Sequence, residues 1–66
     1  MAGMSPEERR AAILSMLDRA TSVQVTQLAE AFGVSRVTAR CDLDVLARDG
    51  KLRRTHGGAV SLSKTL

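Results

Sequence analysis

The chain has 66 residues, and its ten Lys and Arg against seven Asp and Glu give a net charge of +3. This length allows one small domain. The single cysteine excludes an internal disulfide. With only one histidine beside it, a zinc site is excluded as well unless chains combine. No apolar run approaches the roughly 18 residues of a membrane span, and no charged segment precedes an apolar one at the N-terminus. We therefore expect no signal peptide and a cytoplasmic protein without a membrane partner.

The charge is unevenly divided along the chain. Residues 1–34 carry three arginines against four acids, net −1, whereas residues 35–66 carry seven basic residues against three aspartates, net +4. A positive excess confined to one half predicts a polyanionic partner for that half. The alternative is a solvated basic surface that only keeps the domain soluble.

A first helix is predicted over residues 6–20. Ser5 and Glu8 have the spacing of a capping box, and Pro6 suits the first helical position. The residues before the helix, 1–5, are expected to be a disordered N-terminus or a cloning remnant. Apolar residues at helical spacing predict a buried face made of Ile13, Leu14, Leu17 and Ala20. Polar residues are expected mostly outside, namely Arg9, Arg10, Asp18 and Arg19.

Residues 21–25 alternate polar and apolar side chains, which predicts a short strand or an extended connector. Thr26 is then expected to cap a second helix over about residues 27–32. Gly33 is expected to end that helix in a left-handed conformation. Phe32 is the only aromatic residue, and we expect it to plug the centre of the core.

A third helix is predicted from its cap Ser35 to about Arg48, where Asp49-Gly50 ends it. Its apolar stripe, at i, i+4, i+7 and i+8, consists of Ala39, Leu43, Leu46 and Ala47. Two helices joined by a tight turn, at about residues 23–42, form a helix-turn-helix.

Residues 51–62 are predicted to form a β-hairpin, because two short extended runs flank His56-Gly57-Gly58. Both glycines are expected to supply the positive φ of a tight turn. The order is α, short β, α, α, β, β. It predicts a mainly α fold with a small sheet, a winged helix-turn-helix over residues 6–62, in which the hairpin is the wing. Residues 63–66 are expected to be a linker or a cut end.

The third helix has the features of one that enters DNA. The major groove is about 12 Å wide, admits one helix, and offers base acceptors that Arg can grip in bidentate fashion. Arg36 and Arg40 are the candidates for base edges, and Ser35 and Thr38 for phosphate or base contacts. The alternative is a solvated face on which Arg40 pairs with Asp44. Two like charges at i, i+4, however, cost stability unless an anion relieves them.

Further contacts are expected from the wing and the second helix. Arg53 and Arg54 alternate along a strand, so only one of them can face the DNA. At the wing tip, His56 can donate to phosphate and make binding mildly pH-dependent, while Gly57 lets the backbone approach closely. Thr26 is expected to contact phosphate, because the first helix of such a pair crosses the backbone.

The acidic residues are assigned structural roles. Asp42 cannot favour DNA directly and is expected to pair with a wing or helix arginine, with Arg53 and Arg54 as candidates, and so to fix the wing against the third helix. The sequence has no nucleophile with a matching base and no phosphate-cradling loop, so we do not expect an enzyme.

Several segments together carry a family resemblance: Val23-Gln24-Val25, Leu28 to Ser35, Thr38 to Leu43, and Gly50 to Ala59 with its Arg-x-His-Gly-Gly-Ala wing. From about Arg10 to Val60 the chain resembles the N-terminal DNA-binding domain of the DeoR family of bacterial transcriptional regulators. The resemblance implies sequence-specific binding of double-stranded DNA and repression of sugar or nucleoside catabolism genes. It also implies a larger C-terminal domain that binds a phosphorylated sugar and mediates homo-oligomerisation, with no cofactor in the present domain.

Two positions depart from the pattern of that family. It usually carries a second Arg where this chain has Cys41, and a larger aliphatic residue where it has Ala39. Loss of an Arg at a groove-facing position removes a phosphate or guanine contact, which lowers affinity or changes base preference. Cys41 therefore stays among the candidate DNA contacts.

Other functions remain open at this stage. Winged helices also serve as protein–protein or RNA-binding modules, and convergence of Arg40 with Arg53 or Arg54 on one surface would favour DNA. A further alternative is dimerisation through the valines Val37 and Val45. A monomeric fragment is expected to bind DNA weakly, because specific affinity usually needs two half-sites engaged together.

Overall fold

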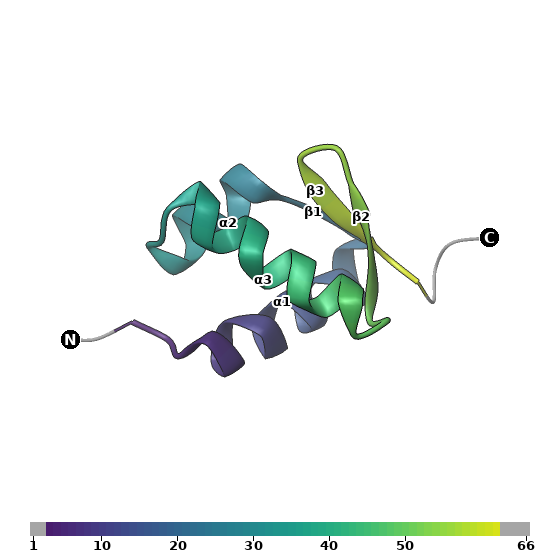
Figure 1. Ribbon diagram of the computed structural model, residues 1–66, viewed down its shortest axis with the longest axis horizontal. Helices are drawn as coiled ribbons and strands as arrows, with labels where there is room; N and C mark the ends of the chain where they lie inside the picture. Colours follow the sequence, from purple (N-terminus) through teal and green to yellow (C-terminus); the bar gives the residue numbers. More distant parts are fainter. Residues whose placement is uncertain (1–2, 63–66) are drawn as a thin grey trace.

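The computed structural model describes residues 3–62. The elements are α1 (Pro6–Ala20), β1 (Ser22–Gln24), α2 (Val25–Phe32), α3 (Arg36–Arg48), β2 (Leu52–Thr55) and β3 (Gly58–Ser61). Figure 1 shows the three helices at the left and centre and the sheet at the right, with the β2–β3 turn at the top. This is the predicted winged helix-turn-helix. The expected linker at 63–66 lies outside the described residues, as do residues 1 and 2 of the expected disordered N-terminus. None of the described helices is long and apolar enough to cross a membrane.

The sheet is antiparallel with the order β1-β3-β2. Val23 lies opposite Ala59, which in turn lies opposite Arg54. Directly opposite residues share a face of a sheet, so these three side chains point toward the helices. Arg53 is exposed on the other face, since neighbouring residues of a strand point to opposite sides.

The helix ends follow the local sequence signals. Ser5 Oγ accepts from the Glu8 N–H at 3.1 Å, and the Glu8 carboxylate accepts from the Ser5 N–H at 2.8 Å. Gly33 ends α2 in the left-handed region, with φ 67°. Gly50, with φ 74°, follows α3. There the Gly50 N–H donates to the Ala47 carbonyl and the next N–H donates to the Leu46 carbonyl, the pattern of a Schellman motif.

Helix α2 begins earlier than predicted. Its first residue is Val25, so Thr26 lies in the first helical turn and is not the cap. The strand β1 runs directly into the helix, and the N-cap position falls on Gln24, whose N–H donates to the Gln27 side-chain oxygen at 3.2 Å. Val25 is buried, and its N–H donates to the Gly57 carbonyl at 2.8 Å. The wing turn therefore supplies the partner for the first amide of α2.

The core forms where the three helices meet the inner face of the sheet. Its fully buried members include Ile13, Val23, Leu28 and Leu43. The expected central role of Phe32 is wrong: this side chain is half-buried and packs against the rim of the core. Phe32 is the last residue of α2, beside the turn, whereas Leu28 one turn earlier points to the centre.

The two wing glycines have different roles. Only His56 and Gly57 form the turn, and Gly57 has φ 97°. Gly58 is the first residue of β3, is buried, and pairs with both neighbouring strands. A Cβ on Gly58 would lie 2.1 Å from the Val23 carbonyl oxygen. The prediction that both glycines serve the turn is therefore wrong, because Gly58 instead allows β1 to approach β3.

We expect Gly58→Ala to destabilise the domain by about 2 kcal/mol or more, at the upper end of overpacking penalties, because the clash is with backbone. This is a large part of the roughly 3–5 kcal/mol that one small core supplies. Urea unfolding followed by circular dichroism measures the change. Gly3→Ala is the control, since nothing lies within 4 Å of its added Cβ. Equal stability of the two variants would contradict the close approach.

Candidate nucleic-acid interface

The outer face of α3 carries two parallel rows of exposed side chains. One row is Arg36, Arg40 and Asp44, and the other is Val37 and Cys41. Residues at i and i+4 are neighbours on a helix surface, so both rows run along the axis. The buried residues of α3 lie on the side of the helix away from Val37 and Cys41, and the row of Arg36 and Arg40 runs between the two sides; the buried residues are Ala39, Asp42, Leu43 and Leu46. The predicted inner and outer faces of α3 are thus those of the structure.

The two arginines of this face are not neutralised within the domain. Among the ion pairs of residues 3–62, none involves Arg36 or Arg40. The alternative pairing of Arg40 with Asp44 does not form, because the Asp44 carboxylate accepts from Arg54 at 2.8 Å. The outer face therefore presents two adjacent positive charges that are available to an anion.

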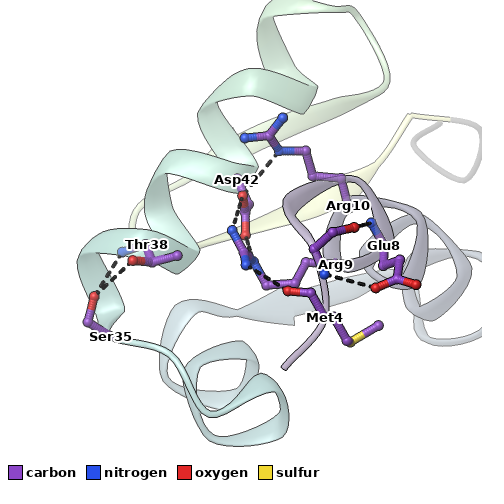
Figure 2. A network of polar contacts seen from close by, with 8 residues as sticks. Met4, Glu8, Arg9, Arg10, Ser35, Thr38 and Asp42 are labelled. Atoms are coloured by element: carbon purple, nitrogen blue, oxygen red, sulfur yellow. Dashed lines mark hydrogen bonds and ion pairs between the residues drawn. The ribbon is translucent and has the colours of Figure 1, made fainter. Parts of the chain in front are cut away.

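The N-terminus of α3 is capped by Ser35, whose hydroxyl group also contacts that of Thr38 (Figure 2). Ser35 Oγ accepts from the Thr38 N–H at 3.1 Å, as predicted for the cap, and donates to Thr38 Oγ1 at 3.1 Å. The hydroxyl proton of Ser35 is therefore used locally. Thr38, half-buried, accepts from Ser35 and keeps its own hydroxyl proton for an outside acceptor.

Asp42 is buried, 1% exposed, between α1 and α3 (Figure 2). Its carboxylate accepts from Arg9 Nε at 2.6 Å, from Arg9 Nη2 at 3.2 Å and from Arg10 Nε at 3.1 Å. The hydrogen bond to Asp42, together with its negative charge, raises the pKa of Arg9 above its ordinary value. Arg9 also donates to the Met4 carbonyl at 3.3 Å, which attaches the segment before α1 to the same group.

This network decides between the expected partners of Asp42 and corrects one further prediction. Asp42 pairs with helix arginines and not with Arg53 or Arg54, so it does not fix the wing against α3. Arg9 and Arg10 do not lie mostly outside, since both are half-buried. The reason is the position of Asp42 beside Leu43, on the side of α3 that faces α1. A carboxylate buried there needs positive partners nearby, and only α1 brings them.

The wing is fixed to α3 by a different acid, two residues further along. Arg54 Nε donates to Asp44 Oδ1 at 2.8 Å, and Arg54 Nη1 donates to the Gly58 carbonyl. Arg54 therefore lies beside the row of Arg36 and Arg40, which it extends. Arg53 points away from the helices, so only one of the two wing arginines joins the α3 surface.

The wing turn lies beside the start of α2. The hydrogen bond from the Val25 N–H to the Gly57 carbonyl joins them. His56, Gly57 and Thr26 are all exposed there. The structure thus gathers these three sequence-predicted contacts at one place, next to but separate from the α3 face.

Val37 also belongs to the α3 face, although its place in the sequence suggested only a dimer contact. Val37 is 63% exposed. The signal was available: Val37 and Cys41 each follow one of the two outward arginines, so helical spacing places them on the same side.

A family model described as the DeoR-like helix-turn-helix domain matches residues 9–65. The chain belongs to this family. It is 39% identical over 57 residues to the uncharacterized HTH-type transcriptional regulator YulB of Bacillus subtilis, covering 86% of this chain and 22% of the relative. It is 43% identical over 60 residues to the transcriptional repressor AccR of Agrobacterium fabrum, covering 91% and 23%.

A third DeoR-like relative is the lactose phosphotransferase system repressor of Lactococcus lactis, 42% identical over 60 residues, with 91% of this chain and 24% of the relative covered. The chain thus spans about a quarter of the length of these relatives. No solved structure matches it. As a DeoR-like helix-turn-helix domain, it is a DNA-binding domain of a transcriptional regulator.

The two aspartates of α3 are expected to differ in their contribution to stability. Asp42→Ala should cost on the order of 3 kcal/mol, because removing one side of a buried ion pair leaves the other uncompensated. Asp44→Ala, at a pair in which Asp44 is 57% exposed, should cost less than about 1 kcal/mol. Urea unfolding at neutral pH separates the two values. Equal losses would show that burial of Asp42 does not matter.

Proposed function

We propose that this domain binds double-stranded DNA with α3 in the major groove and with the wing turn and the start of α2 against the phosphate backbone. The observation that carries this proposal is the exposed pair Arg36 and Arg40, unneutralised on a helix whose other face is built into the core. In this arrangement Arg36, Arg40 and Cys41 face base edges. The proposed phosphate contacts are Thr26, Thr38, Arg54, His56 and Gly57. Ser35 is limited to a minor role because its hydroxyl proton is donated to Thr38, and Arg53 is limited by its orientation.

Charge and shape favour DNA over other partners. Arg54 lies beside the same surface as Arg40, and a positive helix face of this width suits the major groove of B-DNA. The major groove of double-stranded RNA is too deep and narrow for side chains to read. The core of a protein–protein interface is depleted of charged residues, whereas α3 exposes one valine and one cysteine among charges.

The proposal extends to the longer protein of which such domains form part. A relative named as a lactose phosphotransferase system repressor supports control of carbohydrate-utilisation genes. We propose that the parent is a cytoplasmic repressor whose remaining part binds a phosphorylated sugar and forms a homo-oligomer. Two copies of this domain would then engage two half-sites together, which raises the affinity well above that of one domain.

An amide NMR titration with a generic duplex tests the DNA-binding surface. At low salt, shifts are expected at residues 35–41 and 53–58, and they should weaken steeply toward physiological salt as phosphate contacts compete with counterions. An absence of shifts at low salt would overturn the DNA proposal for this domain and favour a protein partner.

Arg40→Ala is expected to weaken binding to a duplex selected from a randomised pool by about 1–3 kcal/mol, the range for a bidentate base contact. Arg48→Ala, at the far end of the same helix and also exposed, controls for loss of one positive charge. Fluorescence anisotropy gives both affinities. If Arg40→Ala weakens selected and unrelated duplexes equally, Arg40 contacts only phosphate.

A further inference from the structure

Val37 is an exposed apolar side chain in an unusual place. It is 63% exposed, and the other large hydrophobic residues exposed within residues 3–62, Met4 and Leu62, lie at the two ends of that range. A single exposed valine is ordinary on a protein surface. Val37, however, lies in the first turn of α3, directly after Arg36, on the face that the proposed function places against DNA.

The surroundings of Val37 limit what it can contact. Cys41 lies one turn further along the same row, and Arg40 lies beside it in the neighbouring row. The N-terminal residues of a recognition helix are those that reach base edges. Since the two arginines bring this surface against a polyanion, Val37 is carried into the groove with them.

The chemistry of valine selects one feature of that groove. Valine has no hydrogen-bonding group, and in a helix its branched side chain is held almost entirely in one rotamer. Among the groups that bases present in the major groove, the 5-methyl of thymine is the apolar one. A rigid pair of methyl groups therefore matches a thymine and leaves a polar base edge unsatisfied.

We propose that Val37 reads the 5-methyl group of a thymine next to a base pair contacted by Arg36 or Arg40. This inference rests on the proposed function, because it requires α3 in the major groove. It assigns to Val37 a role in sequence preference that neither charge nor hydrogen bonding supplies. Cys41, its neighbour in the row, is not required for that contact.

The test replaces each thymine of the selected duplex in turn by uracil, which pairs identically and lacks only the 5-methyl group. For the unmodified domain, one such replacement should weaken binding about three- to fivefold, the value of one buried methyl-sized group. Val37→Ala should lose this sensitivity at that position and bind the thymine and uracil duplexes equally. Alanine is a better helix former than valine, so the variant should fold, which circular dichroism checks.

Leu62→Ala is the matched control, because Leu62 is also an exposed apolar side chain and lies at the end of the described chain; this variant should keep the sensitivity to uracil. If Val37→Ala keeps the sensitivity as well, the proposal for Val37 is overturned. If the duplex binds but no uracil replacement matters, the thymine contact is overturned while the proposed function stands. If no duplex binds at all, both fail. Concentration-dependent sedimentation that disappears in Val37→Ala would instead assign Val37 to contact between copies of the chain.

Discussion

The carboxylate of Asp42 sets the orientation of α3. It accepts hydrogen bonds from Arg9 and Arg10, which lie 33 and 32 positions earlier in the chain. Both arginines belong to α1, so both bonds come from the same side of α3. A buried charge without its partners is costly, so α3 cannot turn about its axis without leaving this carboxylate unpaired. Apolar contacts of Leu43 alone would permit small rotations. The ion pair therefore determines which side of the helix remains outside, and with it where Arg36 and Arg40 point.

Further contacts hold the wing and the start of α2, the other parts of the proposed interface, in fixed positions relative to α3. Arg54 connects the wing to α3 through Asp44, and Gly57 connects the wing turn to the first amide of α2. Because β1 leads into α2 and pairs with β3, the wing is held on both sides. The close approach of β1 to β3 at Gly58 brings the start of α2 still nearer to the wing. The backbone of this surface is thus formed before any ligand arrives, so little backbone conformational entropy remains to be lost on binding.

Local signals made most of this fold predictable. The capping pattern of Ser5, the cap Ser35 and the left-handed Gly33 each act within a few residues, so their positions follow from sequence alone. The partner of Asp42 could not be predicted from the sequence, because the sequence has one adjacent pair of arginines in α1 and another in the wing. Two residues of helix correspond to a rotation of about 200°. Asp42 and its neighbour Asp44 consequently face α1 and the wing, a distinction that only the packing of α3 determines.

Dependence on tertiary packing also explains why the predictions at the wing glycines and at the start of α2 were wrong. The sequence does not distinguish the two adjacent glycines, and only the register of the strands places Gly57 in the turn and Gly58 in β3. The division of α3 into an inner and an outer side also has an evolutionary consequence. Arg36, Val37, Arg40 and Cys41 contribute little to the core, so substitutions there are nearly free of cost to folding. In the proposed binding mode, a regulator built on this domain can acquire a new target sequence by changing these positions, while the inner side and its ion pair are retained because folding requires them.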